Sequence, residues 1–153
     1  IGSMIGFLLF NLGLFGKKRG VFLGDSGSNL IGFWVAWIAI YASQTQTYYI
    51  EPITMLWFVA IPLLDCIGLI FTRIKDGKSW STAGRDHIHH KLMDSFSAKI
   101  ALSIILLVTF LTGLFGIFLD TIVPSYISMM LFIIYGIIYY SVSKLIKGNL
   151  IQN

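Results

Sequence analysis

The stretch Ile100–Leu119 reads IALSIILLVTFLTGLFGIFL, twenty residues without one charged side chain. A helix needs roughly 20 apolar residues to cross about 30 Å of hydrocarbon, and this stretch is long enough. Four other apolar stretches accompany it: Ile1–Phe15, Leu30–Ala42 (which extends back to Ser26), Ile53–Thr72 and Ile122–Ile146. The pattern predicts an all-α, multi-pass transmembrane bundle of about five spans. We expect residues 1–153 to form a single integral membrane domain.

The composition supports a membrane protein. Of the 153 residues, 56% are hydrophobic and 12% are charged, and the mean hydropathy is +0.81. Soluble domains carry about 25% charged residues, so an ordinary cytosolic globular protein is excluded. A disordered chain is excluded too, because disorder needs low hydrophobicity and high charge. Cys66 is the single cysteine, which permits no internal disulfide.

The charges predict the orientation of the bundle. Five spans place successive connections on alternate sides, and all eleven basic residues then fall on one side, whereas the other side carries only Glu51 and Asp120. Basic residues collect in cytoplasmic loops. We therefore expect cytoplasmic loops over residues 16–28 and 73–99 and a cytoplasmic C-terminus. The net charge of +4 then reflects topology, and no nucleic acid partner is expected. The basic residues are Lys17, Lys18, Arg19, Arg73, Lys75, Lys78, Arg85, Lys91, Lys99, Lys144 and Lys147.

A first polar cluster, VFLGDSGSN, covers Val21–Asn29 and precedes the second span. Its glycines allow the backbone to approach a ligand closely. Ser26 or Asn29 is expected to cap the following helix, whose free N–H groups attract phosphate. Asp25 adds a carboxylate there, which suits Mg²⁺ held between protein and phosphate oxygens. The alternative is a plain helix cap and turn without a ligand.

A second cluster lies in the long connection 73–99, which contains GRDHIHHKL with all three histidines within residues 87–90. Loops of this length between spans are usually functional. Basic side chains and imidazoles together suit a diphosphate or a nucleotide base. One alternative is a zinc site, since His87 and His90 lie one helical turn apart, although zinc usually takes four ligands. The other is a solvated polar loop.

A third feature is Asp65, which lies inside the third span after Pro62. Ionisable residues within a span usually face the bundle interior or a wet cavity. By helix rise, Asp65 lies roughly 10–12 Å from the cytoplasmic end near Arg73, within reach of the cavity expected at Asp25. Two roles stay open for it: a structural hydrogen bond to a neighbouring helix, or metal binding. Pro62 should kink the span.

These motifs together resemble those of the polyprenyl-phosphate N-acetylhexosamine-1-phosphate transferases, integral membrane enzymes that start bacterial surface polysaccharides. VFLGDSGS at Val21–Ser28 is similar to the family's V-F-x-G-D-x-G-S, and RDHIHH at Arg85–His90 is similar to its D-R-x-H-x-H-H, preceded by PLLD at Pro62–Asp65. The His-x-His-His form resembles the undecaprenyl-phosphate GlcNAc-1-phosphate branch.

The resemblance implies a reaction and a site. The phosphate of a polyprenyl lipid attacks the β-phosphorus of a UDP-N-acetylhexosamine, UMP leaves, and the lipid-linked product initiates surface polysaccharide or cell-wall polymer synthesis. Asp25 is implied as a catalytic ligand of Mg²⁺, or of Mn²⁺ in its place. Arg85, His87, His89 and His90 are implied to bind the diphosphate or the uridine. The protein is expected in the bacterial inner (cytoplasmic) membrane, with its active-site loops cytoplasmic.

The family's proteins have ten or eleven spans, and their paired aspartates belong to the first half. This chain has no Asp-Asp pair, so it resembles the C-terminal part of such a protein. We expect the chain to be inactive alone. Its expected partner is a missing N-terminal half or, alternatively, a second copy of the chain in a homodimer. Two alternatives stay open: a non-catalytic membrane subunit, and a small transporter whose path Asp65 would line.

Overall fold

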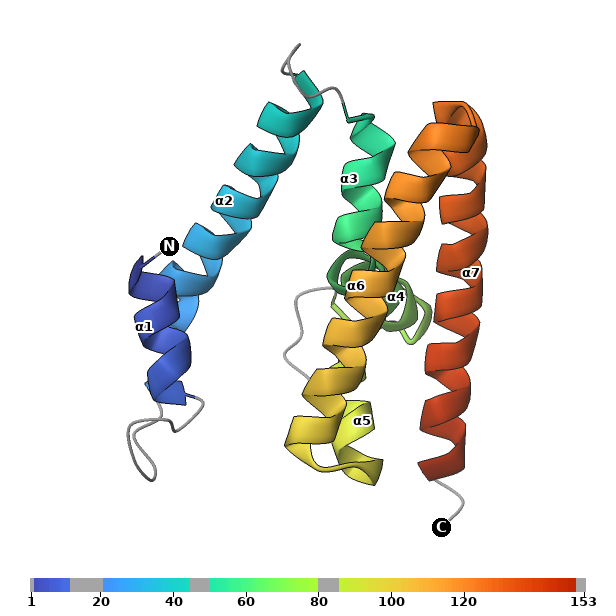
Figure 1. Ribbon diagram of the computed structural model, residues 1–153. Helices are drawn as coiled ribbons and strands as arrows, with labels where there is room; N and C mark the ends of the chain where they lie inside the picture. The colour runs from blue at the N-terminus through green and yellow to red at the C-terminus, as the bar shows by residue number, and fades with distance from the viewer. Residues whose placement is uncertain (1, 12–20, 45–49, 80–85, 151–153) are drawn as a thin grey trace. The chain divides into compact units, whose positions relative to one another are not determined.

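The computed structural model describes residues 2–11, 21–44, 50–79 and 86–150, and this described part contains seven helices and no strand. The all-α prediction is therefore confirmed (Figure 1). The chain divides into two units, Ile1–Tyr41 and Ala42–Asn153, which are described separately. The helices are α1 (Gly2–Asn11), α2 (Gly24–Gln44), α3 (Pro52–Phe58), α4 (Ala60–Lys75), α5 (Ile88–Ser95), α6 (Ala98–Ile122) and α7 (Ser125–Leu150).

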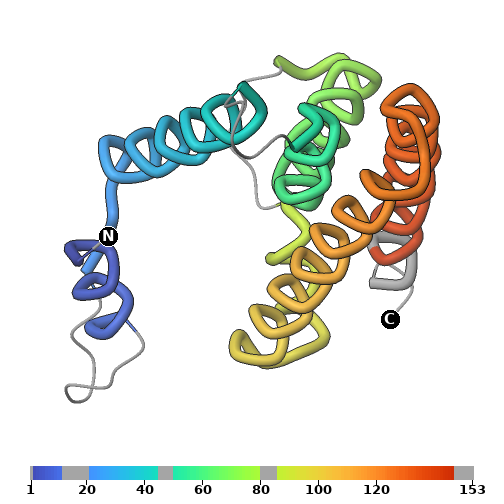
Figure 2. Tube along the Cα trace, turned by 45° about the horizontal axis from the view of Figure 1, so that its top comes forward, coloured from blue at the N-terminus to red at the C-terminus, as the bar shows by residue number. Residues whose placement is uncertain are grey.

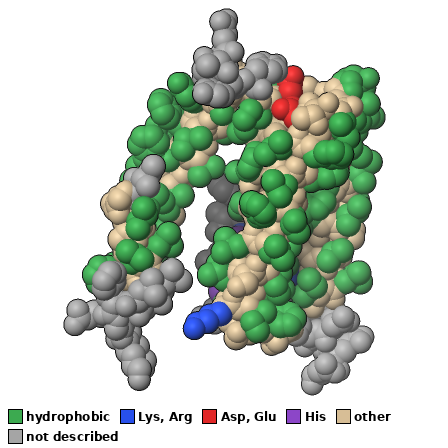
Figure 3. Space-filling view, in the orientation of Figure 1, with side chains coloured by type: hydrophobic (Ala, Val, Ile, Leu, Met, Phe, Trp, Pro, Cys, Tyr) green, Lys and Arg blue, Asp and Glu red, His purple; other side chains and the backbone are tan. Residues whose placement is uncertain are grey.

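Two of the predicted spans are continuous helices long and apolar enough to cross a membrane. They are α6, over Ala98–Ile122, and the segment Ser125–Ile146 of α7. Only 22% and 11% of their apolar windows are buried within the chain. Large apolar side chains consequently cover the outer surface of these helices, as Figure 3 shows for one face. Such surfaces suit contact with lipid or with further apolar helices.

Charge is also distributed unequally along α6. Lys99 stands at its first turn and Asp120 near its last. On the face shown in Figure 3, acidic side chains lie at one end of the helices and basic ones at the other.

The third predicted span is broken. Helices α3 and α4 are separated at Val59 and bent by 80° relative to each other, so that α3 lies upright in Figure 1 while α4 is seen almost end-on. Pro62 explains the break, because its missing N–H and its ring remove the bond to the carbonyl four residues earlier, that of Phe58. The kink predicted from Pro62 is therefore confirmed. Counted as one span, the pair raises the number of candidate spans from two to three.

The first two predicted spans correspond to α1 and α2. Helix α1 has ten residues, and the rest of the predicted stretch, 12–15, lies outside the described residues. Helix α2 starts at Gly24, which agrees with the backward extension of Leu30–Ala42, but neither helix meets the length and apolarity of a span. The polar residues at the start of α2 lower its hydropathy. The count of five spans thus stays a prediction.

The core of the second unit forms around Trp57 of α3, which is 1% exposed. Its ring meets Phe115 and Phe132 edge to face, with centroids 5.2 and 5.1 Å apart, and its Nε1 donates to Ser128 Oγ at 3.1 Å. Buried indole needs such a partner for its N–H. Trp57 thereby joins α3 to both α6 and α7, which diverge from their shared turn (Figure 2).

Gly116 on α6 makes room for this ring. A Cβ added at Gly116 would lie 2.8 Å from Trp57 Cγ, closer than side chains tolerate. At Gly136 on α7, a Cβ would meet only the terminal methyl carbon Cδ2 of Leu64, at 3.1 Å. The terminal methyl group of Leu64 can therefore move aside for a Cβ at Gly136 more easily than the Trp57 side chain can for a Cβ at Gly116.

We expect Gly116→Ala to destabilise the bundle by about 1–2 kcal/mol, because overpacking a core outweighs the better helix propensity of alanine. The measurement is the thermal unfolding midpoint of the complete gene product in detergent. Gly136→Ala is the matched control and should leave the midpoint unchanged or raise it. Equal midpoints for the two variants would contradict the packing described here.

Candidate functional site

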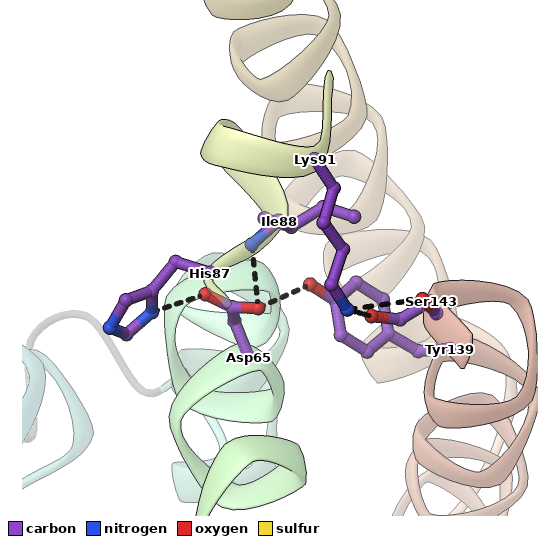
Figure 4. Close-up of polar contacts among 6 residues, drawn as sticks. All are labelled: Asp65, His87, Ile88, Lys91, Tyr139 and Ser143. Atoms are coloured by element: carbon purple, nitrogen blue, oxygen red, sulfur yellow. Dashed lines mark hydrogen bonds and ion pairs between the residues drawn. The ribbon is translucent and has the colours of Figure 1, made fainter. Parts of the chain in front are cut away.

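Asp65 is the centre of a polar cluster in the second unit. Its side chain, 10% exposed, lies on α4, and its carboxylate faces three donors (Figure 4). Oδ2 lies 2.8 Å from Nδ1 of His87, while Oδ1 accepts the backbone N–H of Ile88 at 3.1 Å and the hydroxyl of Tyr139 at 3.3 Å. Of the two roles left open for Asp65, the structure shows the structural hydrogen bond.

The contact with Ile88 explains how α5 begins. His87 occupies the N-cap position with extended backbone angles, and its side chain caps no N–H of the helix. The first N–H groups of a helix lack partners within it. Asp65 supplies the missing acceptor from another helix, and a carboxylate at a helix N-terminus is electrostatically favourable. The sequence predicts a loop over this segment, whereas Ile88–Ser95 is a helix held by a residue 23 positions earlier.

A second polar contact holds the next turn of α5. Lys91 Nζ donates to the backbone carbonyl of Ser143 at 3.0 Å and to its hydroxyl at 2.7 Å. In Figure 4 Lys91 extends on the side of Asp65 opposite to His87. Helix α5 is thus joined to α4 through Asp65 and to α7 through Lys91.

The three histidines form a continuous array on this anchored segment. The rings of His87 and His89 are stacked with centroids 5.6 Å apart, and those of His89 and His90 lie 4.1 Å apart. Partial desolvation and the neighbouring His90 and His87 lower the pKa of His89 below its ordinary value of 6.5, and Asp65 opposes this shift. Near neutral pH His89 is consequently an uncharged imidazole, able to donate one hydrogen bond and accept another.

A cavity of about 250 Å³ lies between α4, α5 and α7, and none of the three histidines lines it. Charged and hydroxyl-bearing side chains share its wall with apolar ones. Those that carry charge or a hydroxyl are Asp65, Thr72, Asp76, Asp86, Lys91, Tyr139, Tyr140, Ser143 and Lys144. Tyr139 and Ser143 are not among the residues predicted from the sequence, although a polar side chain inside an apolar span is itself a signal of an inward-facing position.

Asp25 belongs to the first unit, where it is exposed in the first turn of α2. The helix begins at Gly24, so the expectation that Ser26 or Asn29 caps it is wrong: both lie inside the helix. Gly24 has φ +69°, a conformation that favours glycine. Gly27 has a packing role, because a Cβ there would lie 2.7 Å from Leu23 Cγ.

The described residues contain no group of three or more His, Cys, Asp or Glu side chains arranged to hold a metal ion. The zinc alternative for His87 and His90 therefore has no ligand set in this part of the chain. Asp25 offers one exposed carboxylate, which fits Mg²⁺ in the manner of sites completed by substrate phosphates and water. Arg85 lies outside the described residues.

We expect His90→Ala to raise the pKa of His89 toward 6.5, because the variant removes a neighbouring imidazole that disfavours the charged form. The check is a ¹⁵N-histidine NMR titration of the complete gene product in detergent. His89 would then be half protonated at a higher pH than in the unmodified protein. A pKa that stays the same or falls would contradict the electrostatic coupling within the array.

The chain is similar in sequence to several known proteins. It is 37% identical over 142 residues to an undecaprenyl-phosphate alpha-N-acetylglucosaminyl 1-phosphate transferase of Yersinia pestis, and 35% identical over 142 residues to that of Escherichia coli K12. Each match covers 91% of this chain and 39% of the relative. The transferase of Haemophilus influenzae is 43% identical over 94 residues, which cover 61% of this chain and 26% of the relative.

No family model and no solved structure matches the chain. The chain spans about two-fifths of the length of the Yersinia and Escherichia relatives. The resemblance stated from the two motifs is confirmed: over 91% of its length, the chain is homologous to part of the undecaprenyl-phosphate alpha-N-acetylglucosaminyl 1-phosphate transferases.

Proposed function

We propose that the complete gene product transfers GlcNAc-1-phosphate from UDP-GlcNAc to undecaprenyl phosphate and releases UMP. The observation that carries the proposal is the anchored histidine array on α5, in a chain whose relatives are named for this transfer. Three adjacent imidazoles offer hydrogen-bond donors to phosphoryl oxygens, and such donors stabilise charge that develops during phosphoryl transfer.

The nucleotide sugar is bound, in this proposal, by Arg85, His87, His89 and His90. The Asp65 contact fixes His87 at the start of α5, and His89 and His90 follow it in the first turn. Uncharged His89 suits a hydrogen bond to the uracil or to a phosphate oxygen. Arg85 supplies the fixed positive charge that the diphosphate requires.

In this proposal Asp25, in the first turn of α2, is a ligand of Mg²⁺. When bound, the ion neutralises charge on the diphosphate and on the departing UMP. The start of α2 also supplies N–H groups that favour an anion. With one carboxylate there, most ligands of the ion come from substrate and water, as is usual for Mg²⁺.

The acceptor lipid is bound in an apolar groove between α4 and α7. The groove has a volume of about 620 Å³, and its lining is almost wholly apolar. Lys75, in the last turn of α4, is the charged residue in this lining. An isoprenoid chain with a phosphate at one end matches this combination. The other lining residues are Leu64, Ile67, Gly68, Phe71, Ile74, Phe132, Ile133, Gly136, Ile137 and Tyr140.

The proposal also places the protein in the bacterial cytoplasmic membrane with α5 on the cytoplasmic side. The basic end of α6, at Lys99, adjoins α5, and its acidic end, at Asp120, lies at the opposite end of the helix. This distribution follows the excess of basic residues on the cytoplasmic side. It puts the histidine array where a soluble nucleotide sugar is supplied.

Asp25→Asn should lower Mg²⁺-dependent UMP release about a hundredfold or more, the size of loss seen when one group that stabilises transition-state charge is removed. The assay uses membranes containing the complete gene product, UDP-GlcNAc and undecaprenyl phosphate. Asp120→Asn, the same change near the other end of a span, is the matched control and should keep wild-type activity. Near-normal turnover by Asp25→Asn would remove Asp25 from the site.

Ile133→Trp should raise KM for undecaprenyl phosphate about tenfold, because the indole fills part of the groove and displaces apolar contacts of the isoprenoid. KM for UDP-GlcNAc should not change. Met130→Trp is the control, since Met130 is also exposed on α7 but does not line the groove. If the two variants have the same KM for the lipid, the groove is not its binding site.

A further inference from the structure

The buried carboxylate of Asp65 has no part yet in the proposed chemistry. It takes three hydrogen bonds, and two of the three donors belong to the start of α5. We propose that Asp65 is a positioning residue: it holds His87 by Nδ1 and directs Nε2 to a phosphate of the nucleotide-sugar donor. This inference rests on the proposed transferase function and deepens it.

The contact fixes which ring nitrogen of His87 carries a proton. A carboxylate only accepts hydrogen bonds, so Nδ1, 2.8 Å from Oδ2, must be the donor. Nε2 lies on the other side of the ring and points away from Asp65 (Figure 4). The His87 side chain is 35% exposed, whereas that of Asp65 is 10% exposed. The edge of the ring that bears Nε2 is therefore the one available to a ligand.

The same carboxylate fixes the backbone from which this ring projects. Oδ1 accepts a hydrogen bond from the backbone N–H of Ile88, the residue next to His87. Asp65 therefore holds both the side chain of His87 and the adjacent backbone. Lys91 adds the contact to Ser143 within the following turn. Helix α5 is therefore attached to its neighbours at two points. A rotation of the His87 ring away from the site would break the 2.8 Å hydrogen bond to Asp65.

Capping alone does not explain a carboxylate at this position. An asparagine would also accept the N–H of Ile88 and the hydroxyl of Tyr139, without the cost of placing a charge in an apolar span. Besides the charge that the N-terminus of α5 favours, the contact with His87 distinguishes the two side chains. The amide of asparagine would donate to Nδ1 and leave the proton on Nε2, which reverses the tautomer.

The charge of Asp65 matters once a phosphate lies at Nε2. In this proposal the His87 ring lies between two anionic acceptors, and each of them takes an N–H from one ring nitrogen. His87 then donates from both nitrogens, and charge-assisted bonds of this kind are roughly twice as strong as neutral ones. With asparagine at position 65, the ring would bind the phosphate as a neutral donor.

The test is Asp65→Asn in membranes containing the complete gene product, with His87→Gln and the double variant beside it. Asp65→Asn should raise KM for UDP-GlcNAc about tenfold, the loss expected when a charge-assisted bond becomes neutral. KM for undecaprenyl phosphate should stay within about twofold, since the lipid does not contact His87 in this proposal. The double variant should be no worse than His87→Gln, because Asp65 acts through His87. Asp120→Asn again serves as the matched control.

A second readout does not depend on activity. In ¹⁵N-histidine NMR spectra of the same protein in detergent, His87 should carry its proton on Nδ1, and Asp65→Asn should move it to Nε2. A His87 protonated on Nε2 in the unmodified protein would overturn the proposal, as would losses that multiply in the double variant. Equal effects on both KM values would overturn it too, because they indicate general unfolding of the site.

The two proposals fail differently. If the unmodified protein releases no UMP, the transferase function is wrong, and the assignment of a phosphate to Nε2 falls with it. If the unmodified protein is active and Asp65→Asn matches Asp120→Asn in KM, the transferase function stands and the role of Asp65 is wrong.

Discussion

The bond that Pro62 cannot make determines the arrangement of the second unit. Without an N–H for the carbonyl of Phe58, the third span breaks at Val59, and α4 leaves the direction of α3 by 80°. A straight span would carry Asp65 along the axis of α3. The bend instead brings it beside the start of α5, where it becomes the acceptor for His87 and Ile88. Local backbone chemistry thus decides where the buried charge lies.

The polar side chains around Asp65 and Lys91 form hydrogen bonds that join three helices, α4, α5 and α7. Asp65 meets donors from α5 and α7, and Lys91 meets the carbonyl and hydroxyl of Ser143. A buried charge without such partners would cost several kcal/mol, on the order of 3–5 when one member of a pair is removed. Each contact therefore constrains its partner helix, and together they attach the eight-residue helix α5 to α4 and α7.

The sequence predicted what depends on short-range pattern. The apolar stretches around Ile100–Leu119 and Ile122–Ile146 become helices, and Pro62 breaks its span. It did not predict that residues 88–95 form a helix, because no side chain within that segment caps it; the cap comes from Asp65, 23 positions earlier. Gly27 was interpreted as an approach point for a ligand, whereas the Leu23 side chain occupies that space. Residue spacing reveals neither the hydrogen bond between Asp65 and the distant Ile88 nor the local contact of Gly27 with Leu23.

Helix α4 joins the two halves of the proposed chemistry through its own periodicity. Leu64, Ile67 and Phe71 recur at intervals of three and four residues and line the apolar groove. Asp65, Leu69 and Thr72 recur at intervals of four and three residues and line the polar cavity. Side chains at such intervals share one face of a helix. One helix therefore separates a surface suited to an isoprenoid from a carboxylate that orients His87. The 80° bend that directs α4 away from α3 therefore sets the direction of both surfaces at once.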